Sequence, residues 1–173
     1  MTRNLYLGAD LTPMLIALAS GNNTAIVGAA TQTWAAVQAT RPAERMGAIA
    51  DEIVAADPDA VGLQEVTTWT TFAYNPLNGT TSNPTVEYDF LDLLLDALAE
   101  RGAGYHEVVG ATLTDPDNPL TSRIDLVLYS DEVKAPRATI VGDDPSDMTA
   151  SGLWPSDHAG VVARLVVPAG RGH

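Results

Sequence analysis

Short apolar runs alternate with stretches of helical periodicity along this chain, and this alternation limits the folds that it can adopt. The apolar run VGLQEV, residues 61–66, follows a helical pattern over residues 42–56 that begins at Pro42. A second strong pattern covers residues 87–101, where leucines recur every three or four positions and Gly102 marks the end. Because helices and apolar strands follow one another in this way, we expect an α/β or α+β domain.

Weaker patterns complete the alternation. We expect further helices over residues 11–20 and 24–40, and strands over residues 3–7, 105–111, 123–130, 138–142 and 159–167. Residues 67–86 are rich in Thr, Asn, Pro and Gly, which predicts a long loop that either lines a substrate cleft or is a mobile surface segment. With 173 residues and no internal repeat, the chain fits a single domain over residues 1–173.

Composition and charge exclude several classes of function. The net charge of -13 argues against broad binding to nucleic-acid phosphates, which depends on Lys and Arg, but an acidic surface is compatible with divalent cations. Without Cys the chain has no disulfides and no thiolate ligands. No segment reaches the length of a transmembrane helix and no signal peptide is visible, so the location of the protein stays open.

Polar residues interrupt or end four of the expected strands. They are Asn4, Glu65, Asp125 and the pair Asp157–His158. Each has a structural interpretation when it is taken alone, as an edge hydrogen bond, a structural ion pair or part of a turn. Asp125 lies inside an apolar strand, however, and a carboxylate in such a place needs a partner.

Taken together, these residues fit a metal-assisted reaction at phosphorus. We expect Asp125 to hold one ring nitrogen of His158, which leaves the other nitrogen free to act as a base. Glu65 and Asp157 offer the hard oxygen ligands that Mg²⁺ prefers. Asn4 would hold a phosphate oxygen or the attacking water. Motifs for other chemistries, such as GxSxG, the P-loop and HExxH, do not occur in the sequence.

The segments RNLYLG, VGLQEV, RIDLVLYS and WPSDHAGV, in this order, resemble the endonuclease/exonuclease/phosphatase superfamily of metal-dependent phosphoesterases. This resemblance covers residues 1–66 and 120–167. It implies a four-layer α/β/β/α sandwich and a site that uses Mg²⁺ or Mn²⁺. It further implies that Glu65 is the principal metal ligand, that Asp157 lies beside the metal or the nucleophile, that Asp125 orients His158 at the scissile phosphate, and that Asn4 contacts the phosphate or the metal.

The chain departs from this family between VGLQEV and RIDLVLYS. The family carries a Thr-His segment and a Gly-Asp-x-Asn turn in this interval, and neither is present here. His106 has no Thr before it, and the Gly-Asp of residues 141–147 lacks the Asn and comes after Asp125. We therefore expect an incomplete sandwich, with an internal deletion near residues 110–114 and a first strand that starts partway along its length.

The sequence thus predicts a divalent-metal-dependent phosphoesterase that hydrolyses a phosphodiester or phosphomonoester by attack of water. The missing motifs leave two alternatives, a catalytically inactive remnant and an acidic metal-binding or interaction domain. The substrate would be a small phosphoester, a lipid headgroup or a nucleic acid, with Asn4 and Arg123 as the candidate substrate-binding residues. No protein partner follows from the sequence.

Overall fold

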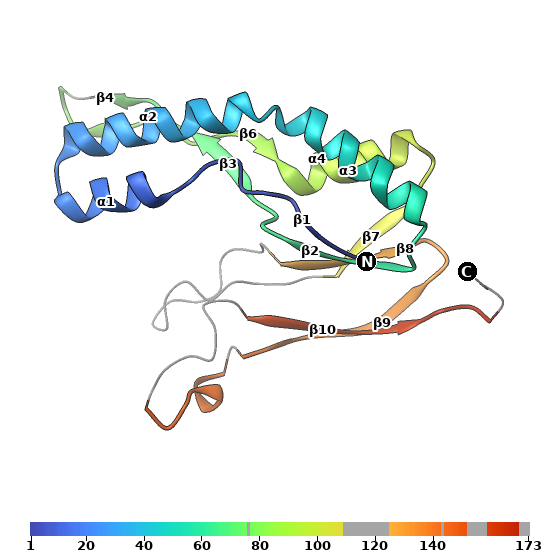
Figure 1. The fold of residues 1–173 in the computed structure, drawn as a ribbon. Helices are drawn as coiled ribbons and strands as arrows, with labels where there is room; N and C mark the ends of the chain where they lie inside the picture. The colour runs from blue at the N-terminus through green and yellow to red at the C-terminus, as the bar shows by residue number, and fades with distance from the viewer. Residues whose placement is uncertain (76, 109–124, 143, 152–158, 170–173) are drawn as a thin grey trace.

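The computed structural model describes residues 1–75, 77–108, 125–142, 144–151 and 159–169. These residues form a mixed α/β structure with four α-helices and several small open sheets (Figure 1). The helices are α1 (Thr12–Ser20), α2 (Asn23–Ala39), α3 (Pro42–Ala56) and α4 (Phe90–Glu100). The strands are β1 (Thr2–Asn4), β2 (Ala60–Gln64), β3 (Thr68–Thr71), β4 (Tyr74–Asn75), β5 (Thr80–Thr81), β6 (Thr85–Asp89), β7 (Tyr105–Val108), β8 (Leu126–Ser130), β9 (Lys134–Val141) and β10 (Gly160–Val166).

The largest sheet has four strands in the order β1-β2-β8-β7. β1 and β2 are parallel, and the chain passes through α1, α2 and α3 between them, whereas β8 is antiparallel to both of its neighbours. The carboxyl ends of β1 and β2 therefore lie at the same end of the sheet as the start of β8 (Figure 1). This arrangement decides which side chains can meet.

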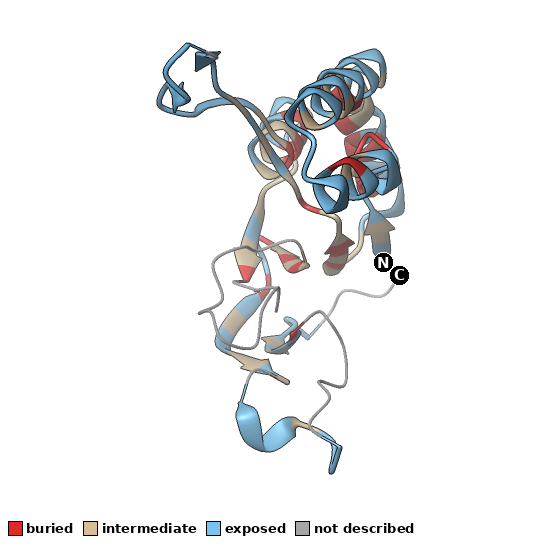
Figure 2. Cartoon of the chain, turned by 90° about the vertical axis from the view of Figure 1, so that its left-hand side faces the viewer, coloured by how far each residue is buried: buried red, intermediate tan, exposed pale blue. Residues whose placement is uncertain are grey.

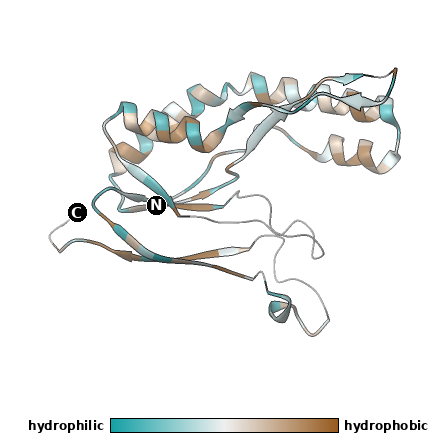
Figure 3. Ribbon diagram, turned by 180° about the vertical axis from the view of Figure 1, so that it is seen from behind, coloured by the Kyte–Doolittle hydropathy of each residue, from teal (hydrophilic) through white to brown (hydrophobic). Residues whose placement is uncertain are grey.

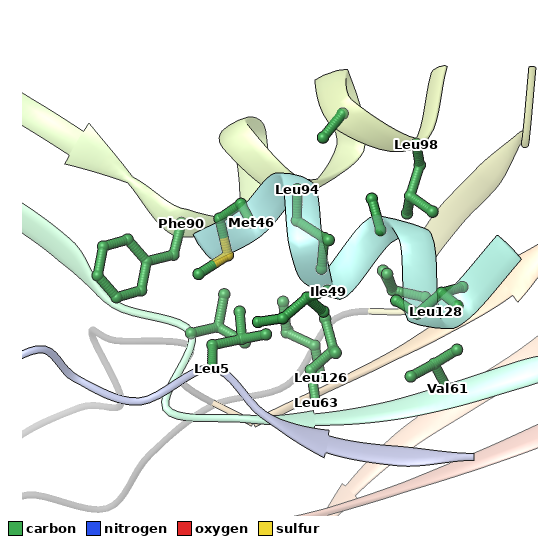
Figure 4. Close-up of a cluster of buried hydrophobic side chains, with 14 residues drawn as sticks. Leu5, Met46, Ile49, Val61, Leu63, Phe90, Leu94, Leu98, Leu126 and Leu128 are labelled. Atoms are coloured by element: carbon green, nitrogen blue, oxygen red, sulfur yellow. The ribbon is translucent and has the colours of Figure 1, made fainter. Parts of the chain in front are cut away.

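The hydrophobic core lies between one face of this sheet and the helices α3 and α4 (Figure 4). Alternate residues of β2 and β8 are buried on that face, as the period of two in a strand requires. The helices contribute residues at spacings of three and four. The fully buried members include Met46, Ile53, Val61, Leu63, Phe90, Leu94, Leu98 and Leu128.

On the opposite face of the sheet, fewer of the described elements pack against the strands. The antiparallel pair β9–β10 lies on this side and contacts β8, while all four described helices lie on the other side (Figure 1). Valines of the pair stay open to solvent, with Val162 55% and Val166 48% exposed. In Figure 2 the buried positions lie on the inward sides of the helices and on the central sheet, whereas the β9–β10 pair is intermediate or exposed.

Residues 67–86 differ from the expected loop. β3 pairs with β6 and β4 pairs with β5, so that two antiparallel ribbons replace it. Their many threonines are β-branched and favour strands. The ring of Tyr88 in β6 lies 5.6 Å from that of Trp34 in α2, which ties the ribbon to the helices. The expected helix 87–101 begins later, at Phe90, because the Asp89 side chain caps it by accepting from the N–H groups of Leu91 and Asp92.

The other expectations are met to different degrees. α3 spans residues 42–56 as predicted, and α1 ends at Gly21, whose φ of 64° is the left-handed conformation that favours glycine. The first strand is shorter than expected, since it ends at Asn4 and the chain then turns. Residues 11–40 contain no charged side chain, and Figure 3 shows α1 as strongly hydrophobic. Across the part of the chain that the structure describes, no helix has both the length and the apolar character needed to span a bilayer.

Candidate active site

Asn4 and Glu65 meet at the end of the central sheet. β1 and β2 are parallel, and Asn4 pairs with Gln64. Asn4 therefore lies at the same end of the sheet as Glu65, the residue that follows Gln64. The Asn4 side-chain amide Nδ2 donates a hydrogen bond to Oε1 of Glu65 over 2.8 Å. Asn4 is exposed and Glu65 is half-buried, which leaves the pair open to solvent on one side.

A tight turn after β1 supplies the second donor to Glu65. The N–H of Leu7 donates to Oε2 of Glu65 over 2.6 Å, so both carboxylate oxygens are held. Asn4 Oδ1 accepts from the N–H of Tyr6, also over 2.6 Å, which closes the turn. Tyr6 and Glu65 have positive φ angles of 57° and 58°. Such angles are rare outside glycine and mark backbone that its surroundings force into place.

Two side chains donate hydrogen bonds to the backbone carbonyl oxygens of this turn. Nη1 of Arg45, in α3, donates to the carbonyl oxygens of Leu5 and Tyr6 over 2.7 and 3.1 Å. The indole Nε1 of Trp69, in β3, donates to the carbonyl oxygen of Leu7 over 2.9 Å. Residues 5 to 7 are thus tied to a helix, to a ribbon and to Glu65, which accounts for the strained geometry.

Asp125 lies at the same end of the sheet. It directly precedes Leu126, which pairs with Leu63 of β2, and it is half-buried. Continuing the antiparallel register by one residue places Asp125 beside Gln64, next to Glu65 in the chain. The structure therefore brings three of the predicted site residues, Asn4, Glu65 and Asp125, to one end of one sheet.

The remaining predicted residues, Asp157, His158 and Arg123, lie outside the described residues, as does the proposed deletion near residues 110–114. The next residue after His158, Ala159, is buried, and β10 starts one residue later. The first residues of β10 lie at the end of the molecule where β1 and β2 finish (Figures 1 and 3).

The charges at this end are few. Throughout the described ranges no group of three or more His, Cys, Asp or Glu side chains has the spacing of a metal site. Glu65 nevertheless suits a hard divalent cation, because each of its oxygens accepts one hydrogen bond and a carboxylate oxygen has further lone pairs. Mg²⁺ is commonly held by one or two carboxylates together with water and substrate phosphate.

His106 and a groove between α1 and α2 are separate from the three site residues. His106 is exposed, as expected for a residue outside the site, and its Nε2 lies 2.7 Å from Oδ1 of Asp131 on the β7–β8 side of the sheet. A groove of about 620 Å³ runs between α1 and α2 and contains none of the predicted site residues. Its wall is formed by Asp10, Thr12, Pro13, Ile16, Ala17, Ser20, Ala25, Gly28, Ala29 and Gln32.

Reasoning from the sequence missed Leu7, Arg45 and Trp69. Leu7 acts through its backbone N–H, so the identity of its side chain does not indicate this role. Trp69 was assigned to a loop. The role of Arg45 could have been suspected from the sequence, because Arg45 lies beside Met46 and one turn before Ile49, which are both buried. An Arg next to the apolar face of a helix needs polar partners for its guanidinium group, and here they are the two carbonyl oxygens.

Comparison of the chain with protein-family models, with curated proteins and with solved structures finds no match. The function of the chain therefore has to be inferred from its own residues and their geometry.

Proposed function

We propose that this chain is a divalent-metal-dependent phosphoesterase of the endonuclease/exonuclease/phosphatase type. The observation that carries the proposal is the fixed Glu65 carboxylate, whose two oxygens are held by Asn4 and by the N–H of Leu7. Asp125 lies at the same end of the sheet. An amide, a restrained carboxylate and a second carboxylate at the ends of adjacent strands suit a reaction that depends on charge and position.

Glu65 would hold Mg²⁺ or Mn²⁺, and Asp157 would be the second carboxylate of the site. The bound ion supplies positive charge that polarises the phosphate oxygens. The hydrogen bonds to Glu65 fix the direction of its free lone pairs before any ligand arrives, so less ordering is needed on binding.

Asn4 would hold the substrate. Its amide Nδ2 carries two N–H groups, of which one goes to Glu65. The other can donate to a phosphate oxygen, and Asn4 is exposed as this role requires. Arg123 is a second candidate contact to the phosphate. Loss of one well-placed donor to a developing negative charge typically lowers kcat by about 10²- to 10³-fold.

His158 and Asp125 would handle the proton. In this proposal Asp125 accepts the N–H of one ring nitrogen of His158, and the other nitrogen takes a proton from the attacking water. The start of β8, where Asp125 lies, and the start of β10, which follows His158, are at the same end of the molecule (Figure 1). This supports a shared site for the two residues.

The finer fold follows from the same proposal. We infer that residues 1–173 form one domain derived from an α/β/β/α sandwich. The layer of α3 and α4, the four-stranded sheet and the β9–β10 pair supply three of the four layers. The exposed valines of β9 and β10 support an incomplete second half.

The test is hydrolysis of bis-p-nitrophenyl phosphate by the purified chain with Mg²⁺ or Mn²⁺. We expect metal-dependent turnover that falls at least about 100-fold in Glu65→Gln and in His158→Ala. Glu44→Gln is the matched control, because Glu44 is exposed and its side chain pairs with that of Arg41. Turnover that survives both site substitutions, or that Glu44→Gln lowers equally, would refute the proposal.

A second candidate is a folded but inactive remnant of such an enzyme. The uncovered face of the β9–β10 pair favours it, since an intact two-sheet sandwich would bury these valines. The same assay separates the two candidates when it is combined with a thermal melt. A cooperative melt without turnover would support the remnant, and a cooperative melt with metal-dependent turnover would support the enzyme.

A further inference from the structure

Arg45 makes an unusual set of contacts for a residue of a surface helix. Its Nη1 donates to the carbonyl oxygens of both Leu5 and Tyr6. Its guanidinium carbon lies 5.3 Å from the ring centroid of Tyr6 and 5.4 Å from that of Phe90. Nε and Nη2 are buried and have no hydrogen-bond partner within the described part of the chain. The polar contacts of this side chain are therefore concentrated on two adjacent backbone carbonyls.

These carbonyls belong to the turn that holds Glu65. Leu5 is fully buried and its N–H donates to the carbonyl of Gln64, so it continues the pairing of β1 with β2. Beyond it the chain reverses at Tyr6, where φ is positive, and the next N–H, that of Leu7, points at Glu65. A change in the Leu5 and Tyr6 peptide planes would redirect the Leu7 N–H.

We propose that Arg45 is the positioning residue for Glu65: it fixes the Leu5 and Tyr6 carbonyls and thereby aims the Leu7 N–H at the Glu65 carboxylate. Arg45 would therefore act on Glu65 through the backbone of residues 5–7. This inference rests on the proposed function for its catalytic consequence only, because the coupling from Arg45 through Leu7 to Glu65 can be measured without turnover.

The chemistry of the guanidinium group suits this role. It is planar, it can lie flat against the rings of Tyr6 and Phe90, and it offers donors in a fixed fork. A Lys ammonium group at the same position keeps the positive charge but has neither the plane nor the fork. Burial lowers the pKa of Arg45 from its usual value, yet a guanidinium stays charged throughout the neutral range. Arg45→Lys therefore changes geometry more than charge.

The experiment follows the Leu7 amide by NMR in wild-type protein and in Arg45→Lys. In the wild type we expect a scalar coupling across the hydrogen bond from the Leu7 amide nitrogen to the Glu65 side-chain carboxyl carbon, and its loss in Glu65→Ala. In Arg45→Lys we expect this coupling to be lost and the Leu7 amide to exchange at least about tenfold faster. Arg41→Lys is the matched control, because Arg41 lies four residues earlier, is exposed and pairs with Glu44; it should leave Leu7 unchanged.

Two results would overturn the inference. One is a folded Arg45→Lys protein in which Leu7 exchanges within twofold of wild type and keeps its scalar coupling to the Glu65 carboxyl carbon. The other needs no variant and applies where Arg45→Lys fails to fold: no scalar coupling, in wild-type protein, from the Arg45 side-chain nitrogen to the Leu5 or Tyr6 carbonyl carbon. Detection of that coupling supports the inference. Absence of hydrolysis by the wild type, with the Leu7 response to Arg45→Lys as expected, would reject the proposed function and keep the positioning role.

Discussion

Glu65 combines a positive φ angle with a carboxylate that two hydrogen bonds hold in place. It has a positive φ of 58°, which costs a non-glycine residue about 1–2 kcal/mol. Hydrogen bonds from Asn4 and Leu7 oppose this cost by fixing the side chain. Strain at a polar residue that ends a buried strand is characteristic of positions kept for function rather than for stability.

The strain at Glu65 can be measured by comparing two substitutions. Glu65→Ala and Glu65→Gly both remove the carboxylate, but only glycine adopts a positive φ without steric cost. The free energy of unfolding of Glu65→Gly should therefore exceed that of Glu65→Ala by about 0.5–1 kcal/mol, in urea titrations monitored by circular dichroism. An alanine variant that is as stable as the glycine variant would show that position 65 is unstrained.

The polar residues of this site were easier to predict from the sequence than the residues that hold them in place. Asn4 and Glu65 stood out because polar groups at the ends of apolar strands are unusual, and the parallel register of β1 and β2 brings them together. The roles of Leu7 and Arg45 pass through backbone atoms, which a sequence pattern does not report. Asp157, His158 and Arg123 stay predictions, because they lie outside the described residues.

Among the elements, helices followed the sequence closely and the ribbons did not. α3 was predictable because Pro42 starts it and its apolar residues recur at helical spacing. β3 to β6 were not predicted because their segment is rich in turn residues, and the pairing of its strands with one another decides the structure. The first strand ended early because the Asn4 side chain accepts from the Tyr6 N–H and turns the chain.

The packing of α3 on α4 includes an ion pair with a defined pH dependence. Nε of Arg101 lies 2.6 Å from Oδ1 of Asp51, and this hydrogen bond lowers the pKa of Asp51. A carboxyl group with a lowered pKa in the folded state stabilises the fold above its unfolded pKa, and this contribution is lost as the pH falls through the lowered pKa. The stabilisation should therefore be complete at pH 7 and disappear in acid.

Asp51→Asn tests this link between the helices. At pH 7 it should lower the melting temperature by no more than about 3 °C, because the Asp51 side chain is 70% exposed. The difference from wild type should shrink as the pH is lowered from 7 toward about 3. In an Arg101→Gln background the substitution should have no effect. A difference that stays constant with pH, or that persists without Arg101, would contradict the assignment.

At the scale of the molecule, the two faces of the central sheet are unequal. One face is covered by α3 and α4 over a continuous apolar core, while the described residues on the other side are mainly those of the β9–β10 pair with its exposed valines (Figure 2). The α/β class followed from the alternation of helices and strands. The incomplete sandwich, which the missing motifs suggest, stays a prediction.

Three of the polar residues that the sequence indicates nevertheless lie at one end of this uneven structure. Asn4, Glu65 and Asp125 come from three different strands or strand ends, and the sheet topology alone explains why they meet there. We propose that this end of the sheet binds a divalent cation beside a phosphate.

The most direct test of that claim is an electron paramagnetic resonance titration of the purified chain with Mn²⁺, in parallel with Glu65→Gln and the control Glu44→Gln. The six-line signal of free Mn²⁺ disappears when the ion is bound. We predict one bound Mn²⁺ per chain in wild type and in Glu44→Gln, with affinity at least about tenfold weaker in Glu65→Gln. Equal binding by all three proteins, or no binding by wild type, would contradict the account.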